Sequence, residues 1–392
     1  MSKIGSIQAA TYVFFSLIFY FIGVVALAST VEVISVTAFL LITTFLLAKS
    51  SPFSNYNLNM IVLRFSGFDF FTTLIVLYLF IVLVLSIGYA LNGVPVFSDN
   101  VEVARMQLVN DYGVVYRVVT QALFFAPVML VYGLCNRFIG RPVFWFMWLL
   151  TFVMLFSMGF RSRIVDYSIL TIISYYIISD IKFNFSVKNI FAMFLGCLCV
   201  GVGLIFLIAW LTAAREGIDE PFEALNSVMY RAFYLNYIVN FERIYVFVDH
   251  NGYKFGLTFL TDFISMVSST VDSMQVEVTK YFNYTNSDLF IMTPTVYGEF
   301  YLNFGYMAFA AAIPIFYVYR FAVEFIAYIL SKLPATGVLF VCFLVNLVYY
   351  FPRQIVTGGI SNAFVVRVAS IVIVFLLFYV LIQMFKLMVS RR

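Results

Sequence analysis

The chain has 392 residues, of which 64% are hydrophobic and only 11% are charged, and its formal net charge is +4. The charged fraction is about half that of an average soluble domain, and one soluble core could not bury so much apolar surface. The composition therefore excludes an ordinary soluble domain. The small net charge is spread along the chain and gives no basic surface for nucleic acid.

Apolar runs close to bilayer length recur along the chain, so we expect an all-α polytopic membrane protein with about 10–11 transmembrane helices. The first run follows a single lysine, lacks a small-residue cleavage site, and is expected to be a retained helix. Residues 320–331 are either an interfacial helix or part of an eleventh span. The expected spans are residues 9–29, 31–48, 70–90, 114–134, 143–159, 164–179, 191–213, 303–319, 334–351 and 367–387.

These spans divide the chain into N-terminal membrane helices at 1–213, one long hydrophilic loop at 214–302 and C-terminal membrane helices at 303–392. If the amino terminus is cytoplasmic, the short cytoplasmic segments hold twelve lysines and arginines and the short outer segments hold six. Because short cytoplasmic loops are enriched in these residues, the count predicts that both termini are cytoplasmic. The six outer residues are Arg105, Arg117, Arg161, Arg163, Arg353 and Arg367.

All six of these outer residues are arginines, and the long loop adds Arg215, Arg231 and Arg243 against two lysines. The planar guanidinium group can grip two phosphate oxygens at once, which lysine cannot do. Arginines kept on the outer face against the usual bias therefore predict an anionic ligand there, and a lipid-linked pyrophosphate is the natural candidate. The alternative is that each arginine pairs with a nearby carboxylate or reaches to lipid headgroups.

Two outer segments lie in the first half of the chain. Residues 91–113 contain a Gly-Val-Pro turn, and Ser98-Asp99 is expected to cap a short helix that carries Arg105. The segment FRSRIVD places Arg161, Arg163 and Asp166 close to the lipid boundary, where an ionisable group is costly unless it faces a cavity or a partner. The alternative to a functional role is a structural Arg163–Asp166 pair one helical turn apart.

In the long loop, residues 221–247 are predicted to form an amphipathic helix, and 256–275 a second helix with a weaker pattern. Tyrosines and one phenylalanine share one face of the first helix, where they either stack on sugar rings or lie at the bilayer interface. His250 is the only histidine of the chain, which excludes a histidine-based metal site. The shared face consists of Tyr230, Tyr234, Tyr237, Phe241 and Tyr245.

Two further segments adjoin the C-terminal spans. Glu299, in PTVYGEFYLNFGY, is placed either to accept a proton from an attacking hydroxyl or to fix one of the arginines. In PRQIVTGGISN, Arg353 directly follows a span, and Gly358-Gly359 allows a close backbone approach to a ligand. No phosphate-binding loop, nucleophile elbow or dinucleotide fingerprint occurs, so nothing indicates ATP use or serine-based hydrolysis.

Three pieces of the sequence, in this order, carry a resemblance to a known family: NGVPVFSDNVEVAR at 92–105, GFRSR at 159–163, and GEFYLNFGYMA at 298–308. With the long outer loop before the third piece, the chain resembles the bacterial O-antigen polymerases of the Wzy type, which join oligosaccharide repeat units. It departs from the family pattern at Met307-Ala308, where a glycine is usual, and it lacks a proline near residue 265.

The resemblance implies a GT-C-like glycosyltransferase fold in the bacterial inner membrane, with the long loop in the periplasm. It also implies the reaction, in which a growing glycan moves from undecaprenyl pyrophosphate onto the next lipid-linked repeat unit, without a nucleotide sugar, a cofactor or a metal. The bilayer and the lipid-linked oligosaccharide are the expected partners, and a chain-length regulator protein is left open as a third.

A pyrophosphate leaving group needs cations, and the acceptor hydroxyl needs a base. For the base we expect Glu299 first, with Asp166 or His250 after it. Two rival functions share parts of this pattern. An O-antigen ligase uses the same donor, whereas a lipid-linked oligosaccharide flippase or transporter would need ionisable groups deep in several helices. We expect pyrophosphate to be held by Arg161, Arg163, Arg215 and Arg353, with Arg105 and Arg231 as further candidates.

Overall fold

The computed structural model describes most of the chain, and every regular element among the described residues is a helix. The expectation of an all-α polytopic membrane protein is therefore confirmed at the level of helix content and apolar character. The described residues are 3–17, 29–49, 66–98, 101–159, 161–179, 242–267, 274–282, 295–333 and 337–390, together with residues 206, 209, 222, 223, 225, 226, 230 and 272.

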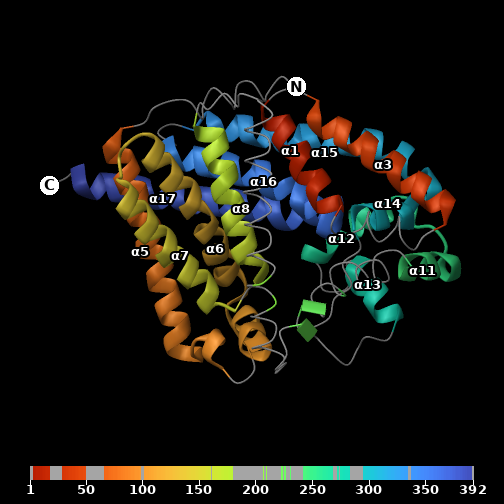
Figure 1. Ribbon diagram of the computed structural model, residues 1–392, viewed down its shortest axis with the longest axis horizontal. Coiled ribbons are helices and arrows are strands. Elements are labelled where there is room, and N and C mark those ends of the chain that lie inside the picture. The colour runs from red at the N-terminus through yellow and green to blue at the C-terminus, as the bar shows by residue number, and fades with distance from the viewer. Residues whose placement is uncertain are drawn as a thin grey trace. The chain divides into compact units, whose positions relative to one another are not determined.

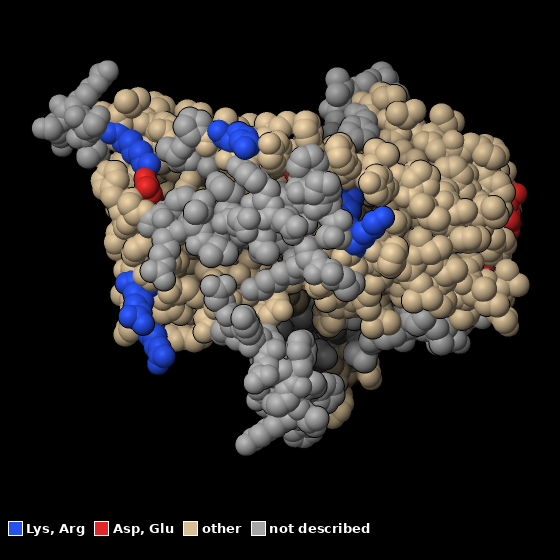
Figure 2. Space-filling model, turned by 90° about the horizontal axis from the view of Figure 1, so that it is seen from above, with Lys and Arg blue, Asp and Glu red and all other residues tan. Residues whose placement is uncertain are grey.

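Within this part of the chain, six helical stretches are long and apolar enough to cross a membrane, and α7 (Arg141–Ser157) is apolar but shorter. On the face drawn in Figure 2, most of the described surface is neither Lys, Arg, Asp nor Glu. The expected span 191–213 lies outside the described ranges, as does most of the second half of span 9–29. The six stretches are Thr30–Ala48, Gly67–Phe97, Val118–Cys135, Val296–Ser331, Gly337–Ser361 and Ala369–Met388.

The chain forms two compact units, residues 1–63 with 232–379, and residues 64–231 with 380–392. The first unit therefore combines the start of the chain with most of its C-terminal half. Its helices are α1 (Lys3–Ser16), α3 (Thr30–Ala48), α11 (Arg243–Asn251), α12 (Leu257–Val267), α13 (Met274–Tyr281), α14 (Val296–Phe304), η6 (Gly305–Met307), α15 (Ala308–Ser331), α16 (Gly337–Asn362), the π-helix η7 (Ala363–Val368) and the first half of α17 (Ala369–Ser390).

In the first unit, α1 packs on α3 and α16, and α14 packs on α15 and α16 (Figure 1). Phe39 of α3 lies at the centre of this packing, with its ring 5.5 Å from that of Tyr297 and 5.3 Å from that of Phe300. The buried hydroxyls are satisfied across helices, since Tyr297 Oη donates to Ser35 Oγ at 3.0 Å. These contacts hold α14, which carries Glu299, against α3.

The second unit is built around α6 (Val101–Cys135), which packs against α5 (Gly67–Asn92), α7 and α8 (Arg161–Ile178) (Figure 1). The short 3-10 helix η2 (Pro95–Phe97) contacts α6 and α7. Hydroxyl pairs join neighbouring helices: Tyr78 with Thr151 at 2.7 Å and Tyr89 with Ser157 at 2.6 Å. The first pair is buried and the second is partly buried, and in each pair the two hydroxyls satisfy one another.

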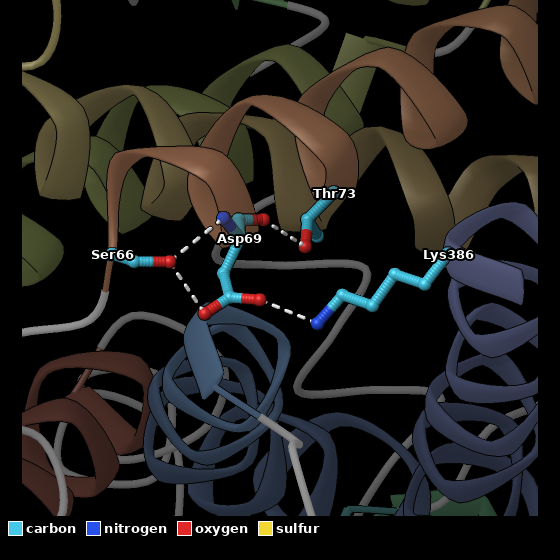
Figure 3. Close-up of polar contacts among 4 residues, drawn as sticks. All are labelled: Ser66, Asp69, Thr73 and Lys386. Carbon is cyan, nitrogen blue, oxygen red and sulfur yellow. Dashed lines mark hydrogen bonds and ion pairs between the residues drawn. The ribbon is translucent and has the colours of Figure 1, made fainter. Parts of the chain in front are cut away.

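The amino end of α5 is fastened to the last turns of α17 by a charged contact (Figure 3). Ser66 caps α5 by accepting the Asp69 N–H at 3.2 Å, and its hydroxyl donates to the Asp69 carboxylate at 2.7 Å. The other carboxylate oxygen accepts a hydrogen bond from Lys386 Nζ. Both charged side chains are partly exposed, so this contact is a partly exposed ion pair and not a buried one.

Three expected helix boundaries are wrong. The span expected at 334–351 was to end before Arg353, whereas α16 continues through Pro352 and Arg353. The short helix expected to carry Arg105 is not separate, because α6 runs without a break from Val101 to Cys135. Likewise residues 320–331 continue the preceding span as α15, which passes through Pro314 and ends only at Ser331. At each of these places the helix continues past the expected boundary.

Candidate functional site

The C-terminal half of α16 contains a break at Gly359, whose backbone dihedral angles are φ 81° and ψ 168°. This conformation is open to glycine and strained for other residues, so the sequence itself fixes where the helix is interrupted. The chain resumes a helical course at Ile360, which leaves the Ile360 N–H without a carbonyl partner in the preceding turn. The break therefore creates a donor that must be satisfied from elsewhere.

Glu299 of α14 satisfies that donor. Its side chain is fully buried; Oε2 accepts the Ile360 N–H at 2.6 Å, and Oε1 accepts the Ser361 hydroxyl at 2.8 Å. A Cβ at Gly359 would lie 2.5 Å from Glu299 Oε2, so only glycine permits this approach. The close backbone approach expected at Gly358-Gly359 is thus made, at Gly359, to a carboxylate of the protein itself.

Asn303 lies one turn further along α14 and binds the beginning of α12. Its Nδ2 donates to Thr258 Oγ1 at 2.5 Å, and its Oδ1 accepts the Gly256 N–H at 2.8 Å. Asn303 is also fully buried. Glu299 and Asn303 therefore connect α14 to the break in α16 on one side and to the start of α12 on the other.

Sequence reasoning missed Asn303 and Ser361 as partners in this network. The four-residue spacing of Glu299 and Asn303, which puts two polar side chains on one face of an apolar helix, was the available signal. Nothing in the local sequence, however, pairs Glu299 with Ser361, because the two are 62 residues apart.

Arg353 and Arg367, which we call the arginine pair, lie beside this break on aromatic rings. The Arg353 guanidinium carbon is 5.5 Å from the ring centre of Phe15, and that of Arg367 is 5.7 Å from the ring centre of Tyr350. Arg367 Nε also donates to Gln354 Oε1 at 3.1 Å. Both arginines are partly exposed. A guanidinium attracted to the face of an aromatic ring is a cation of the type that also binds phosphate.

The rings beneath the arginine pair are continuous. The Phe15 ring centre is 6.3 Å from that of Tyr349, and Tyr349 is 4.8 Å from Tyr350. Residues of α1 and α16 thus provide one aromatic support for two cations. Arg367 is one of the six outer arginines but was not expected in the site, because its pairing with Gln354 follows only from the turn made by η7.

The second unit carries further predicted site residues that the structure describes, on α6 and α8. The Arg163 guanidinium is 5.7 Å from the ring centre of Phe124, and Asp166 is buried with 1% of its surface exposed. For Arg161, the first residue of α8, and for Arg105 in α6, only the backbone is described. Arg215 and Arg231 lie outside the described residues, as does most of the predicted helix 221–247.

His250, the third candidate base, lies on the first unit in the last turn of α11 and is exposed. Its Nδ1 is 2.5 Å from the phenol oxygen of Tyr281 on α13. On the other face of α11, burial raises the pKa of Tyr245 above the usual tyrosine value, so this phenol stays neutral at any physiological pH. The ring of Tyr245 packs 4.3 Å from that of Tyr301, which joins α11 to α14.

Among the described residues, no group of three or more His, Cys, Asp and Glu side chains is arranged to hold a metal ion. Comparisons of the chain with protein-family models, with curated proteins and with solved structures find no match. The site is therefore interpreted from its own residues and from the resemblance of its motifs.

Proposed function

We propose that this protein is a glycosyltransferase that polymerises lipid-linked oligosaccharide repeat units at the outer face of a bacterial inner membrane. Its donor is a glycan on undecaprenyl pyrophosphate, and its acceptor is the next lipid-linked repeat. The order of the three motifs, the apolar helical fold and the arginines of the outer segments support this proposal. A polymerase that takes both substrates from the membrane needs no cytoplasmic nucleotide sugar.

The observation that carries the proposal is the contact of Glu299 with Ile360 and Ser361. It connects the motif GEFYLNFGYMA, which resembles the polymerase family, to the segment that carries Arg353. The arginine pair, on its aromatic support, presents two cations of the kind that bind pyrophosphate. Cations fixed in advance, where charge develops on a leaving group, are the largest single source of catalysis in such reactions.

In the proposed reaction, a hydroxyl oxygen of the acceptor sugar forms a bond to the anomeric carbon of the donor. The bond from that carbon to the pyrophosphate oxygen breaks, and its electron pair leaves with undecaprenyl pyrophosphate. The hydroxyl proton passes to a base. Arginines would stabilise the departing pyrophosphate, whose charge rises as the bond breaks.

The contacts of Glu299 favour a positioning role over that of the base. Both of its carboxylate oxygens already accept hydrogen bonds from the protein, and the side chain is fully enclosed. Asp166 and His250 remain predicted alternatives for the base. A carboxylate that holds the helix break would affect catalysis through the arginine pair rather than through proton transfer.

Deleting the gene and analysing the lipopolysaccharide ladder tests the function directly. Loss of a polymerase leaves single repeat units attached to the lipid A–core, whereas loss of a ligase leaves none. Loss of a flippase also removes repeats from the outer face, and lipid-linked repeats then accumulate on the cytoplasmic side. Any result other than single attached repeats contradicts the proposal.

Substitution of the arginines tests the site. Replacing Arg161, Arg163 or Arg353 by alanine should lower polymer formation by about two to three orders of magnitude, and lysine should restore only part of it. The same pair of substitutions at Arg367 tests the residue that the structure adds. Arg243→Ala is the matched control, because this arginine also lies over a ring, that of Phe282, at 5.7 Å. Full-length polymer from the alanine variants at normal expression would reject the assignment.

A further inference from the structure

The short helix α12, from the hydrophilic loop before α14, buries the polar side chain of Thr258. Thr258 is 2% exposed, and its hydroxyl accepts the hydrogen bond from Asn303 described above. Phe259, on the same side, packs on the rings of Phe300 and Phe304. The inner face of α12 is therefore already occupied by α14.

The outer face of α12 is apolar and exposed. Leu257, Leu260 and Ile264 are 58%, 60% and 48% exposed, and their spacing of i, i+3 and i+7 puts them on one stripe of the helix. Phe255, in the turn before the helix, is 78% exposed. A surface helix in water normally exposes its polar side chains and buries its apolar ones, whereas α12 exposes apolar side chains. A contiguous exposed apolar stripe usually marks a surface that contacts another apolar surface.

The stripe adjoins the beginning of a membrane span. The Lys254 N–H donates to the Leu302 carbonyl at 3.0 Å, and the Phe255 N–H donates to the Asn303 carbonyl at 3.2 Å. Residues 253–256 thus run along the end of α14, which belongs to the candidate span Val296–Ser331. The exposed stripe of α12 therefore begins beside a helix that belongs to a candidate membrane span.

Partly exposed tyrosines lie beside the same end of α14. Tyr253 and Tyr306 are 41% and 43% exposed, and both rings contact the buried ring of Tyr301, at 6.4 Å and 5.4 Å. Gly305 permits this arrangement, since a Cβ there would lie 2.6 Å from the phenol oxygen of Tyr253. Tyrosines with an apolar ring and a wet hydroxyl are enriched where a membrane span meets the headgroups.

The neighbouring helix α13 exposes charged side chains instead of apolar ones. Its Lys280 pairs with Asp272 at 2.6 Å, and these side chains are 60% and 44% exposed. Its Glu277 pairs at 2.5 Å with Lys254, the residue at the beginning of the turn into α12. Charged side chains exposed to this degree require water or headgroups, so a polarity boundary runs between α13 and the apolar stripe of α12.

From these observations we infer that α12 lies in the membrane–water interface, with Phe255, Leu257, Leu260 and Ile264 in the acyl boundary and α13 in water. The apolar stripe is short, and the depth of such a helix is about 5–10 Å. Part of the segment that the sequence classes as a hydrophilic loop is thus a membrane-bound element. This inference does not depend on the proposed enzymatic function.

Spin labelling tests the inference on the full chain. Cys135, Cys197, Cys199 and Cys342 are first replaced by serine or alanine, and single cysteines are then placed at Leu260, at Ile264 and at two controls. Val318, 64% exposed within α15, is the lipid-facing control, and Lys280 of α13 is the water-facing control. The labelled protein is reconstituted in vesicles of phosphatidylethanolamine and phosphatidylglycerol.

Collisional relaxation by oxygen, which concentrates in lipid, is compared with relaxation by a water-soluble nickel chelate. The expected result is an oxygen-to-nickel ratio at Leu260 and Ile264 close to that at Val318 and several-fold above that at Lys280. Nickel-dominated relaxation at both α12 positions would overturn the inference. Labels that are immobile and shielded from both agents would overturn it as well, because the stripe would then be covered by protein, such as a second copy.

Discussion

Gly359 is the residue on which the candidate site depends most directly. Its positive φ interrupts α16, and its missing side chain leaves room for the Glu299 carboxylate. The interruption of the helix and the close approach of the buried carboxylate both depend on this one small residue. A substitution there therefore has two separable costs, one for backbone conformation and one for space.

Gly359→Ala should destabilise the protein more than Gly252→Ala, which is the matched control. Both glycines have positive φ, 81° and 71°, but a Cβ at Gly252 has nothing within 4 Å. The control should therefore cost about 1 kcal/mol for backbone strain alone, and Gly359→Ala about 1–3 kcal/mol more, because a buried carboxylate loses its donors. Unfolding in mixed detergent micelles measures both. Equal costs would show that Glu299 gains nothing from the missing side chain.

Glu299→Gln distinguishes a positioning residue from a catalytic base, with Ser361→Ala as its partner variant. If Glu299 positions the break, both substitutions should lower unfolding stability and polymer length in parallel, and Glu299→Asp should give partial rescue. If Glu299 is the base, Glu299→Gln should abolish polymer without a loss of stability, whereas Ser361→Ala should leave polymer nearly intact. The glycan ladder and detergent unfolding, measured on the same samples, decide between the two.

At the scale of elements, α15 carries a charged pair within its last turns. Arg320 Nε lies 3.0 Å from Glu324 Oε1, with 9% of each side chain exposed, and the guanidinium also donates to the Leu46 carbonyl at the end of α3. The helix can continue past a charge because the charge is satisfied by a partner one turn away and by a free carbonyl of a neighbouring helix. The pair therefore joins α15 to α3.

Arg320→Ala should destabilise the protein by about 3–5 kcal/mol, because it leaves Glu324 buried without its partner. The double variant Arg320→Met with Glu324→Leu should recover most of this loss. Lys386→Ala is the comparison: it breaks the Asp69 contact, whose side chains are 22% and 34% exposed, and should cost at most about 1 kcal/mol. Thermal unfolding in one detergent ranks the three variants, and a cost for Lys386→Ala equal to that of Arg320→Ala would contradict this order.

The spans were predicted well where a long apolar run decides them, and poorly where a helix continues through polar or charged residues. The apolar runs at 31–48 and 70–90 agree with α3 and α5 within a few residues, because lipid requires each span to satisfy its own backbone. The continuation of α15 past Arg320 was missed, since its partners Glu324 and Leu46 are recognised only once α3 and α15 are packed.

The candidate site was predicted in its residue types but not in its connections. An outer face rich in arginine and a glutamate before a span are visible in the sequence. The aromatic support of the arginine pair combines α1 with α16, and the Glu299 contact spans 61 residues. Such pairings depend on which spans become neighbours, and a single sequence does not carry that information.

At the scale of the whole molecule, the lysine and arginine count predicts an orientation that labelling can check. A single cysteine at Lys280 should react with a membrane-impermeant maleimide in intact spheroplasts, whereas one at Arg141 should react only after lysis. Both positions are exposed, so their accessibility differs only by side. A carboxyl-terminal green fluorescent protein should fluoresce. The reverse labelling pattern would place the arginine pair in the cytoplasm and remove the basis of the proposed function.

The division of the first unit between residues 1–63 and 232–379 has a consequence for biosynthesis. When the ribosome has completed α1 and α3, their partners α15 and α16 have not yet been translated. Phe39 and Tyr12, fully buried in the finished protein, must wait in the bilayer or with an insertion factor while more than two hundred residues are added. A chain released early by a stop codon before α14 therefore leaves its first two helices without α15 and α16, and membrane proteases are the expected fate of such a product.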